Sequence, residues 1–231
     1  MDEELKKYLE TEVDFIGGLK RIAETNNKKI VFSTSFGMED QVISHVIFKN
    51  QFNNIEVFTL DTGRLFPETY SVWNKTLKQY NEKINSYNPN TSDVENFVDR
   101  NGINPFYDSV SLRKECCAIR KVAPLNRALK NADIWITGLR AEQSENRNSL
   151  QKVAWDEKLQ LYKYNPLLDW TTSQVKEFIN TNAVPYNTLH DNGFISIGCA
   201  PCTRAIKEGE DFRAGRWWWE DKSKKECGLH Q

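Results

Sequence analysis

The amino-acid sequence predicts an α/β fold in which a mostly parallel sheet carries helices on both faces. Short apolar runs at residues 29–33, 55–60 and 133–137 are typical of buried strands. Segments with the apolar period of a helix follow the first two runs, over residues 39–49 and 67–80. Strands that alternate with helices in this way are typical of a parallel sheet.

The remaining elements complete this α/β pattern. The periodicity predicts an amphipathic helix over residues 3–25, a strand over 83–87, helices over 91–100 and 116–130, a hairpin over 151–164 and a helix over 172–182. Thr171 or Thr172 is the expected N-cap of that last helix. Glycines and three successive tryptophans (217–219) lie near the end, so we expect an α/β domain over residues 1–208 and a mobile tail over 209–231.

Composition and charge exclude several classes of protein. The chain has 231 residues, of which 39% are hydrophobic, which is enough for one domain with a full core. Its net charge of −1 gives no basic field of the kind that binds nucleic acid. No apolar run approaches the roughly 20 residues of a membrane span, and the charged N-terminus lacks the apolar region of a signal peptide. We therefore expect a soluble cytoplasmic protein without nucleic-acid or membrane partners.

Three polar loops follow predicted strands. Residues 33–40 offer hydroxyls and a glycine ahead of a helix, which favours phosphate binding, and residues 60–70 follow the next strand. Residues 137–147 include Arg140 and Arg147, whose planar, permanently charged side chains suit an oxyanion. Each loop alone is also consistent with an ordinary strand-to-helix connection. Ligands of open parallel sheets bind at the carboxyl ends of strands, so we expect the three loops to face one crevice.

Four of the five cysteines form two pairs. Cys116 and Cys117 are adjacent, and Cys199 and Cys202 form a C-x-x-C pair that begins 82 residues after Cys117. Two thiolate pairs are the usual way to build a four-sulfur metal site. Adjacent cysteines are uncommon in zinc sites and suit an iron–sulfur cluster, in which neighbouring cysteines ligate different irons. Structural zinc, a redox dithiol and unrelated buried thiols stay open from the residues alone.

The fifth cysteine, Cys227, lies four residues from the end of the chain. Lys224 and Lys225 precede it, and His230 follows three residues later. Positive charge near a thiol lowers its pKa and raises the thiolate fraction. Cys227 is therefore a candidate nucleophile with His230 as a candidate assistant, and an inert tail thiol is the alternative.

Seven segments together resemble the assimilatory adenylyl-sulfate and phosphoadenylyl-sulfate reductases, in particular their iron–sulfur, thioredoxin-linked branch. In this sequence they read Ser-Phe-Gly-Met-Glu-Asp (35–40), Leu-Asp-Thr-Gly-Arg-Leu-Phe-Pro-Glu-Thr-Tyr (60–70), Lys-Glu-Cys-Cys-Ala-Ile-Arg-Lys (114–121), Thr-Gly-Leu-Arg-Ala-Glu-Gln-Ser (137–144), Ile-Gly-Cys-Ala-Pro-Cys-Thr-Arg (197–204), Gly-Arg-Trp-Trp-Trp-Glu (215–220) and Lys-Glu-Cys-Gly-Leu-His (225–230). They occur in the order of the family and span nearly the whole chain.

The resemblance implies an adenine-nucleotide α-hydrolase-like fold and an enzyme that reduces adenosine 5′-phosphosulfate to sulfite and AMP with thioredoxin or a similar dithiol. This reaction belongs to assimilatory sulfate reduction and cysteine biosynthesis. It implies that Cys227 forms an S-sulfonate, assisted by Lys121, and that one [4Fe-4S] cluster is held by Cys116, Cys117, Cys199 and Cys202. The implied substrate-binding residues are Ser33, Ser35, Leu60, Gly138, Arg147, Arg213 and Arg216. Arg140, from the polar loop described above, is added to them as a candidate.

Other interpretations remain at this stage. The substrate of the same reaction is alternatively the 3′-phosphorylated form, 3′-phosphoadenosine 5′-phosphosulfate. An ATP-pyrophosphatase-type adenylating enzyme shares the expected sheet, although its phosphate loop usually reads Ser-Gly-Gly-x-Asp-Ser. A non-enzymatic iron–sulfur or zinc sensor has no need of Cys227 or of three anion-binding loops. Whether the chain forms a homo-oligomer is left open.

Overall fold

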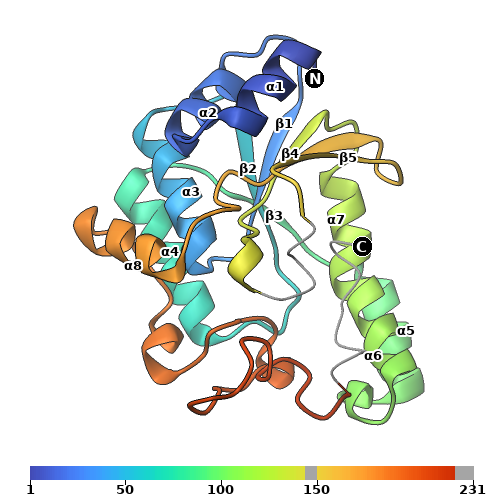
Figure 1. Cartoon of the computed structure of the whole chain (residues 1–231). Helices are drawn as coiled ribbons and strands as arrows, with labels where there is room; N and C mark the ends of the chain where they lie inside the picture. Colours follow the sequence, from blue (N-terminus) through green and yellow to red (C-terminus); the bar gives the residue numbers. More distant parts are fainter. Residues whose placement is uncertain (144–149, 222–231) are drawn as a thin grey trace. The chain divides into compact units, whose positions relative to one another are not determined.

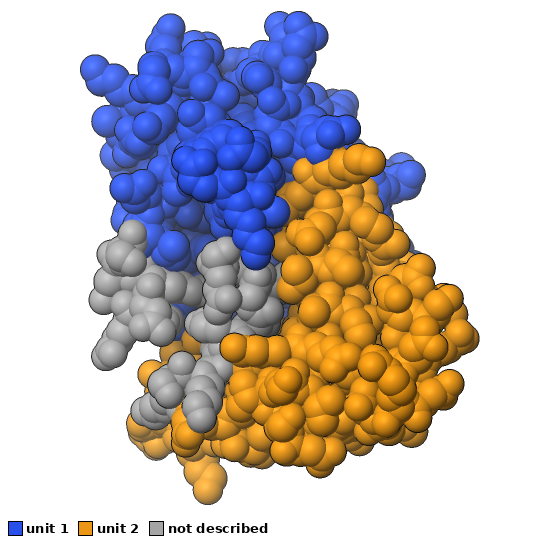
Figure 2. Space-filling model, turned by 90° about the vertical axis from the view of Figure 1, so that its right-hand side faces the viewer, with its two compact units in different colours: residues 1–59, 69–85, 131–187 blue, residues 60–68, 86–130, 188–231 orange. Residues whose placement is uncertain are grey.

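A computed structural model describes residues 1–143 and 150–221 of the chain (Figure 1). The chain divides into two compact units, which Figure 2 shows in different colours. Residues 1–59, 69–85 and 131–187 form the first, which we call the sheet unit. Residues 60–68, 86–130 and 188–231 form the second, which we call the cysteine unit. These units are interleaved in the sequence, and neither has a boundary at residue 209, where we expected one.

The sheet has six strands among the described residues, in the order β3-β2-β1-β4-β6-β5. They are β1 (Ile30–Thr34), β2 (Ile55–Leu60), β3 (Asn85–Tyr87), β4 (Ile134–Ile136), β5 (Val153–Asp156) and β6 (Leu161–Tyr164). β1 pairs in parallel with β2 and with β4, and β4 pairs in parallel with β6. β5 is antiparallel to β6 and forms the expected hairpin with it. The prediction of a mostly parallel α/β sheet is therefore confirmed.

The helices that accompany this sheet are α1 (Glu3–Thr11), α2 (Phe15–Ala23), α3 (Met38–Lys49), α4 (Pro67–Tyr80) and α8 (Thr172–Thr181). Of these, α1, α2 and α8 each begin at a residue whose side chain caps the helix. The single helix expected over residues 3–25 is wrong, because the Asp14 side chain accepts hydrogen bonds from the N–H groups of Ile16 and Gly17 and starts a second helix. Thr171 caps α8 through a reciprocal capping box with Gln174, as one of the two expected residues.

The core of the sheet unit explains why its strands read as continuous apolar runs. Val31 and Phe32 are adjacent in β1 and therefore point to opposite faces, yet both are fully buried. A strand that is covered on both faces carries apolar side chains at successive positions rather than at alternate ones. Helix α3 packs on β1 and on α8, and α1 packs on α2 and β5. This packing fixes the loops at the carboxyl ends of β1 and β4.

The cysteine unit contains one long helical segment with a change of pitch. It consists of α6 (Val110–Cys117), a π-helical turn (Ala118–Val122) and α7 (Ala123–Ala128), and α5 (Thr91–Asn101) packs against the π turn. The segment begins six residues before the expected start at residue 116, because the Ser109 side chain accepts a hydrogen bond of 3.2 Å from the N–H of Leu112. The π turn follows directly after Cys117. A π turn within an α-helix frequently occurs at a functional site.

The chain from residue 209 to residue 221 packs into the cysteine unit. Trp217, which we placed in a mobile tail, is fully buried, and Arg216 is 8% exposed. Trp218 remains 39% exposed beside it. Within residues 1–143 and 150–221, no helix combines the length and the apolar character needed to cross a membrane.

Candidate functional site

The two candidate serines, Ser33 in β1 and Ser35 in the loop after it, are both held by hydrogen bonds within the sheet unit. The Ser33 hydroxyl accepts a hydrogen bond of 2.9 Å from the Trp135 indole N–H. The Ser35 amide and hydroxyl donate hydrogen bonds of 2.6 and 2.7 Å to the Oδ2 atom of Asp40. Asp40 lies in the first turn of α3, so these bonds fix the loop against the start of that helix.

Asp40 is a buried carboxyl that sequence reasoning did not single out. Burial raises its pKa to about 6, although the two hydrogen bonds from Ser35 act in the opposite direction. Gly138 lies directly against it, because an added β-carbon at residue 138 would overlap Asp40 Oδ1. Two of the loops expected at the nucleotide site, after β1 and after β4, therefore meet at Asp40.

Arg140, the candidate anion clamp in the loop after β4, is hydrogen-bonded to protein groups within the sheet unit. Its Nε atom donates to Glu39 at 2.8 Å. Its Nη1 atom donates to Glu142 and to the Trp170 carbonyl, and its Nη2 atom donates to the Thr172 hydroxyl at 3.0 Å. All three guanidinium nitrogens are therefore engaged with protein groups, and the side chain is 1% exposed. Arg140 joins the loop after β4 to the starts of α3 and α8.

The four paired cysteines line one pocket in the cysteine unit. Cys116 and Cys117 end α6, Cys199 precedes the short 3₁₀ turn Ala200–Cys202, and Cys202 ends that turn. The complete set of residues that line the pocket is Arg64, Phe106, Arg113, Cys116, Cys117, Arg120, Lys121, Cys199, Pro201, Cys202 and Trp217. Residues 82 positions apart in the sequence are thus brought together, as the pairing of the cysteines predicted.

The thiols of Cys116, Cys199 and Cys202 have pKa values shifted by their surroundings. Burial raises the pKa of Cys202 to about 12, and burial also raises the pKa of Cys116. Burial opposes ionisation of Cys199 as well, but the Lys121 ammonium and a hydrogen bond with Thr62 outweigh it, so the pKa of Cys199 is lowered. Lys121 is therefore the cation that most strongly favours the thiolate form of Cys199.

An iron–sulfur cluster fits the chemistry of this pocket. The Trp217 indole N–H is buried and has no hydrogen-bond partner among the described residues, which suits a donor that faces a sulfur acceptor. Four cationic side chains line the pocket and complement the negative charge of four thiolates: Arg64, Arg113, Arg120 and Lys121. Within the described part of the chain, no group of three or more His, Cys, Asp or Glu side chains is arranged to hold a single metal ion.

Sequence reasoning missed Thr62, whose hydroxyl lies 3.3 Å from the Cys199 sulfur. It also missed the salt bridge between Arg113 and Glu220, whose side chains are 1% and 2% exposed. The only sequence signal for Arg113 is its position, one helical turn before Cys117. Nothing in the sequence pairs it with a carboxylate 107 residues away.

The two candidate arginines near the end of the described chain lie in the cysteine unit. The Arg216 guanidinium carbon is 4.7 Å from the centroid of the Trp217 ring, and the corresponding Arg213 distance is 6.0 Å. The Nε atom of Arg216 is buried and has no partner in the described residues, so it is available to an anion. Leu60 ends β2 and is half-buried. The remaining candidates, Arg147, Cys227 and His230, lie outside the described residues.

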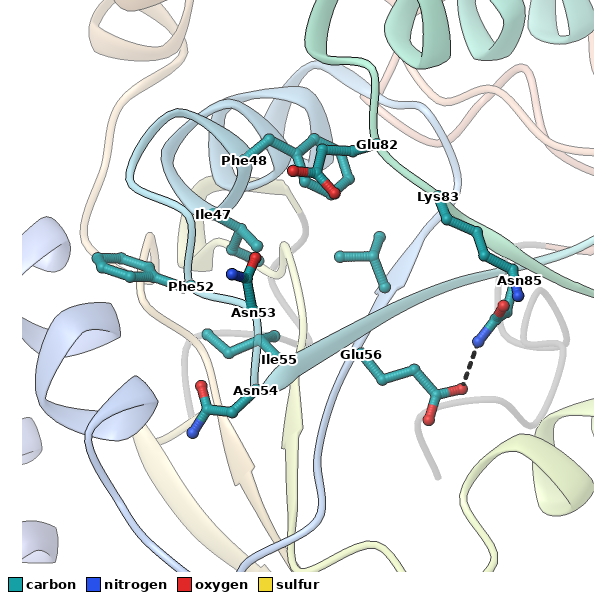
Figure 3. Close-up of a pocket in the computed structure, with 11 residues that line it drawn as sticks. Ile47, Phe48, Phe52, Asn53, Asn54, Ile55, Glu56, Glu82, Lys83 and Asn85 are labelled. Atoms are coloured by element: carbon teal, nitrogen blue, oxygen red, sulfur yellow. Dashed lines mark hydrogen bonds between the residues drawn. The ribbon is translucent and has the colours of Figure 1, made fainter.

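A second pocket, of about 280 Å³, opens in the sheet unit at the amino end of β2 (Figure 3). Ile47, Phe48 and Phe52 give it an apolar side, and a hydrogen bond of 2.9 Å from Asn85 to Glu56 crosses its polar side. β1 and β2 are parallel, so this pocket lies at the amino ends of the strands, whereas the candidate loops follow their carboxyl ends. It is separate from the candidate site.

Comparison with known proteins agrees with these features. A sequence profile described as the phosphoadenosine phosphosulfate reductase domain matches residues 29–205. An adenosine 5′-phosphosulfate reductase from Allochromatium vinosum is 50% identical over 202 residues, which cover 87% of this chain and 78% of the relative. One of the same name from Neisseria meningitidis is 47% identical over 214 residues, which cover 92% and 87%.

Solved structures give a consistent result. The crystal structure of phosphoadenylyl-sulfate reductase from Candida auris matches with a TM-score of 0.74 and 28% identity, over 89% of this chain and 98% of that one. An FMN adenylyltransferase from Candida glabrata matches with a TM-score of 0.54 and 14% identity over 96% and 83%, which reflects a shared nucleotide-binding fold alone. Since the profile covers most of the chain and close relatives cover nearly all of it, the chain belongs to the phosphoadenosine phosphosulfate reductase family.

Proposed function

We propose that this chain reduces adenosine 5′-phosphosulfate to sulfite and AMP with electrons from thioredoxin or a similar dithiol. The enzyme would serve assimilatory sulfate reduction and cysteine biosynthesis. The observation that carries the proposal is the pocket in which both cysteine pairs meet Lys121. The names of the curated relatives favour adenosine 5′-phosphosulfate over its 3′-phosphorylated form as the substrate.

The proposed cofactor is one [4Fe-4S] cluster, held by Cys116, Cys117, Cys199 and Cys202. Bound there, it would keep the four cysteines ionised and place their negative charge beside Lys121, and no change in its oxidation state is required. The proposed site of action is the cytoplasm, whose reducing conditions keep thiols available as ligands and as nucleophiles.

The first step is an attack by the Cys227 thiolate on the sulfur of adenosine 5′-phosphosulfate. The bond between that sulfur and the phosphate oxygen breaks, AMP leaves with the bonding electron pair, and Cys227 becomes an S-sulfonate. This covalent route divides one difficult displacement into two easier ones. His230, three residues after Cys227 in the sequence, is proposed to assist the thiolate.

The second step uses a dithiol donor. One donor thiolate attacks the Cys227 sulfur, and sulfite leaves. The donor and Cys227 are then joined by a mixed disulfide. The second donor thiol then attacks this disulfide and releases the Cys227 thiolate. The substrate sulfur gains two electrons in total, and both come from the donor, which ends as a disulfide.

The cationic side chains lower the electrostatic barrier to the first step. A thiolate and a phosphosulfate repel each other, so positive charge near both is needed for their approach. Lys121, Arg213 and Arg216 are proposed to supply it, together with Arg147. The buried, unpartnered Nε atom of Arg216 supports this role, because such an atom gains a hydrogen bond when an anion binds. Ser33, Ser35, Leu60 and Gly138 are proposed to hold the nucleotide.

A turnover assay tests the proposal. Anaerobically purified protein is given reduced thioredoxin and either adenosine 5′-phosphosulfate or its 3′-phosphorylated form, and sulfite is measured. We expect sulfite mainly from the first substrate, and an absorption band near roughly 400 nm from thiolate-to-iron charge transfer. Sulfite mainly from the second substrate would assign the alternative specificity. No sulfite from either, by protein that holds iron, would contradict the proposal.

A further inference from the structure

The Trp217 residue connects both cysteine pairs. Its amide N–H donates a hydrogen bond of 3.1 Å to the Cys202 carbonyl, and its side chain lines the cysteine pocket. The guanidinium carbons of Arg113 and Arg216 each lie 4.7 Å from the centroid of its ring. Trp217 has a backbone φ of 42°, in the left-handed region that side chains other than glycine rarely adopt. The surrounding contacts therefore determine its conformation.

Arg113 is fixed by a buried carboxylate. Its Nε and Nη2 atoms donate hydrogen bonds of 2.9 and 2.7 Å to the two oxygens of Glu220. This bidentate geometry holds the plane of the guanidinium in one orientation. Glu220 is only three residues after Trp217, so the pair joins helix α6 to the chain that leads toward Cys227.

Arg113 also contacts a candidate ligand of the cluster. It makes a side-chain hydrogen bond with Cys117, which lies one helical turn later in α6. A cation that touches the Cys117 sulfur changes the charge felt by any group bound to that sulfur. Glu220 accepts two hydrogen bonds from the same cation and reduces its effect, because the two charges oppose each other at short range.

We propose that Glu220 is a positioning residue, which holds the Arg113 guanidinium against Cys117 and the Trp217 ring and offsets part of its charge at the cysteine pocket. Arg113 and Glu220 thereby connect the cluster to Arg216, because Arg113 and Arg216 both contact the Trp217 ring. This inference rests on the proposed function only through the iron–sulfur group.

Opposite shifts in reduction potential provide the test. Removal of a negative charge near a cluster favours its reduction, and removal of a positive charge disfavours it. We therefore expect Glu220→Gln to shift the midpoint potential of the anaerobic holoprotein to more positive values, and Arg113→Met to shift it to more negative ones. The double variant Arg113→Met/Glu220→Gln loses both charges and is expected to return toward the wild-type value. An EPR-monitored titration gives the potentials.

A matched control lies on the same helix. Glu115 pairs with Arg100 at 3.1 Å, but its side chain is 40% exposed and that of Arg100 is 65% exposed. Glu115→Gln removes the same charge in a position screened by water, so we expect no measurable shift. Glu220→Asp keeps the charge but shortens the side chain. We expect it to release iron to a chelator several-fold faster than wild type, as does Arg113→Lys.

The outcomes separate this inference from the proposed function. Shifts in the same direction for Glu220→Gln and Arg113→Met, or no shift at wild-type iron content, would overturn the inference alone. If those variants bind no iron, wild-type rates of iron loss in Glu220→Asp and Arg113→Lys would overturn it instead. Opposite shifts in a protein that forms no sulfite would retain it and reject the proposed reaction. A wild-type protein that takes up no iron would overturn both the cofactor and this inference.

Discussion

A β-carbon on Gly138 would overlap the Oδ1 atom of Asp40, so the loop after β4 and the first turn of α3 fit together only because residue 138 has no side chain. The next nearest atom is Glu39 Cβ, 3.2 Å from the added carbon. The Asp40 carboxyl that blocks this position is itself held by two hydrogen bonds from Ser35, so it has little freedom to move aside.

Gly138→Ala is expected to destabilise the protein by about 1–3 kcal/mol, the usual cost of forcing an extra carbon into a packed site. Urea unfolding measures this change. Gly37→Ala is the matched control for stability, because a β-carbon there meets its nearest atom at 3.6 Å, an ordinary contact. Equal unfolding free energies for Gly138→Ala and wild type would show that Asp40 moves aside at little cost.

The buried Asp40 carboxyl predicts a pH dependence of stability. Its pKa is raised by burial to about 6, above the value of about 3.9 in an unfolded chain, so the folded state binds the proton more tightly. Its contribution to the unfolding free energy therefore falls as the pH rises from about 4 to about 6, by about 3 kcal/mol in total.

Asp40→Asn is expected to remove this decrease. Unfolding free energies of the two proteins, measured by urea at intervals between about pH 4 and 7, are expected to diverge as the pH rises, with the wild type losing stability relative to the variant. Parallel curves would mean that the hydrogen bonds from Ser35 keep Asp40 ionised throughout the range.

Arg140→Gln is expected to reduce the unfolding free energy by about 3–5 kcal/mol, because it leaves the Glu39 carboxylate without its buried cation. Lys20→Gln is the control, since the Lys20 and Glu24 side chains are 66% and 55% exposed and an ion pair so exposed contributes little. Unchanged stability of Arg140→Gln, combined with a loss of AMP affinity, would instead support the hypothesis that Arg140 binds the anion directly.

Two cysteine variants are expected to separate the proposed roles. Cys202→Ser is expected to lose iron and the band near roughly 400 nm, because a cluster ligand is removed. Cys227→Ser is expected to keep both, and to bind AMP as wild type does, but to form no sulfite. Iron analysis, equilibrium binding of AMP and sulfite assays check these outcomes. Loss of iron in Cys227→Ser would show that the cysteines are divided wrongly.

The sequence predicted those elements whose signals are local. β2 matches the expected bounds at both ends, because its apolar residues lie between polar segments on either side. The start of α6 was missed, because it depends on the Ser109 cap, which was not identified from the sequence. The π turn after Cys117 changes the pitch of a helix without changing its composition, so periodicity does not reveal it.

The site was predicted in its chemistry more fully than in its contacts. The spacing of the cysteines indicated that they meet, and they line one pocket. The sequence showed the charge of Arg140 but not Glu39, its partner 101 residues away. Buried pairs such as these depend on tertiary packing, and a single sequence carries no signal for which two distant charges meet.

The interleaved chain of the cysteine unit also has a consequence for biosynthesis. A ribosome that adds about 5–20 residues per second needs roughly 4–16 seconds to extend the chain from Cys117 to Cys199. Throughout that interval the first cysteine pair and Arg113 exist without Cys202, Trp217 or Glu220. Co-translational delivery of iron during this interval would meet only half of the proposed ligands, so synthesis of the second cysteine pair sets the earliest time at which the metallocentre can be loaded.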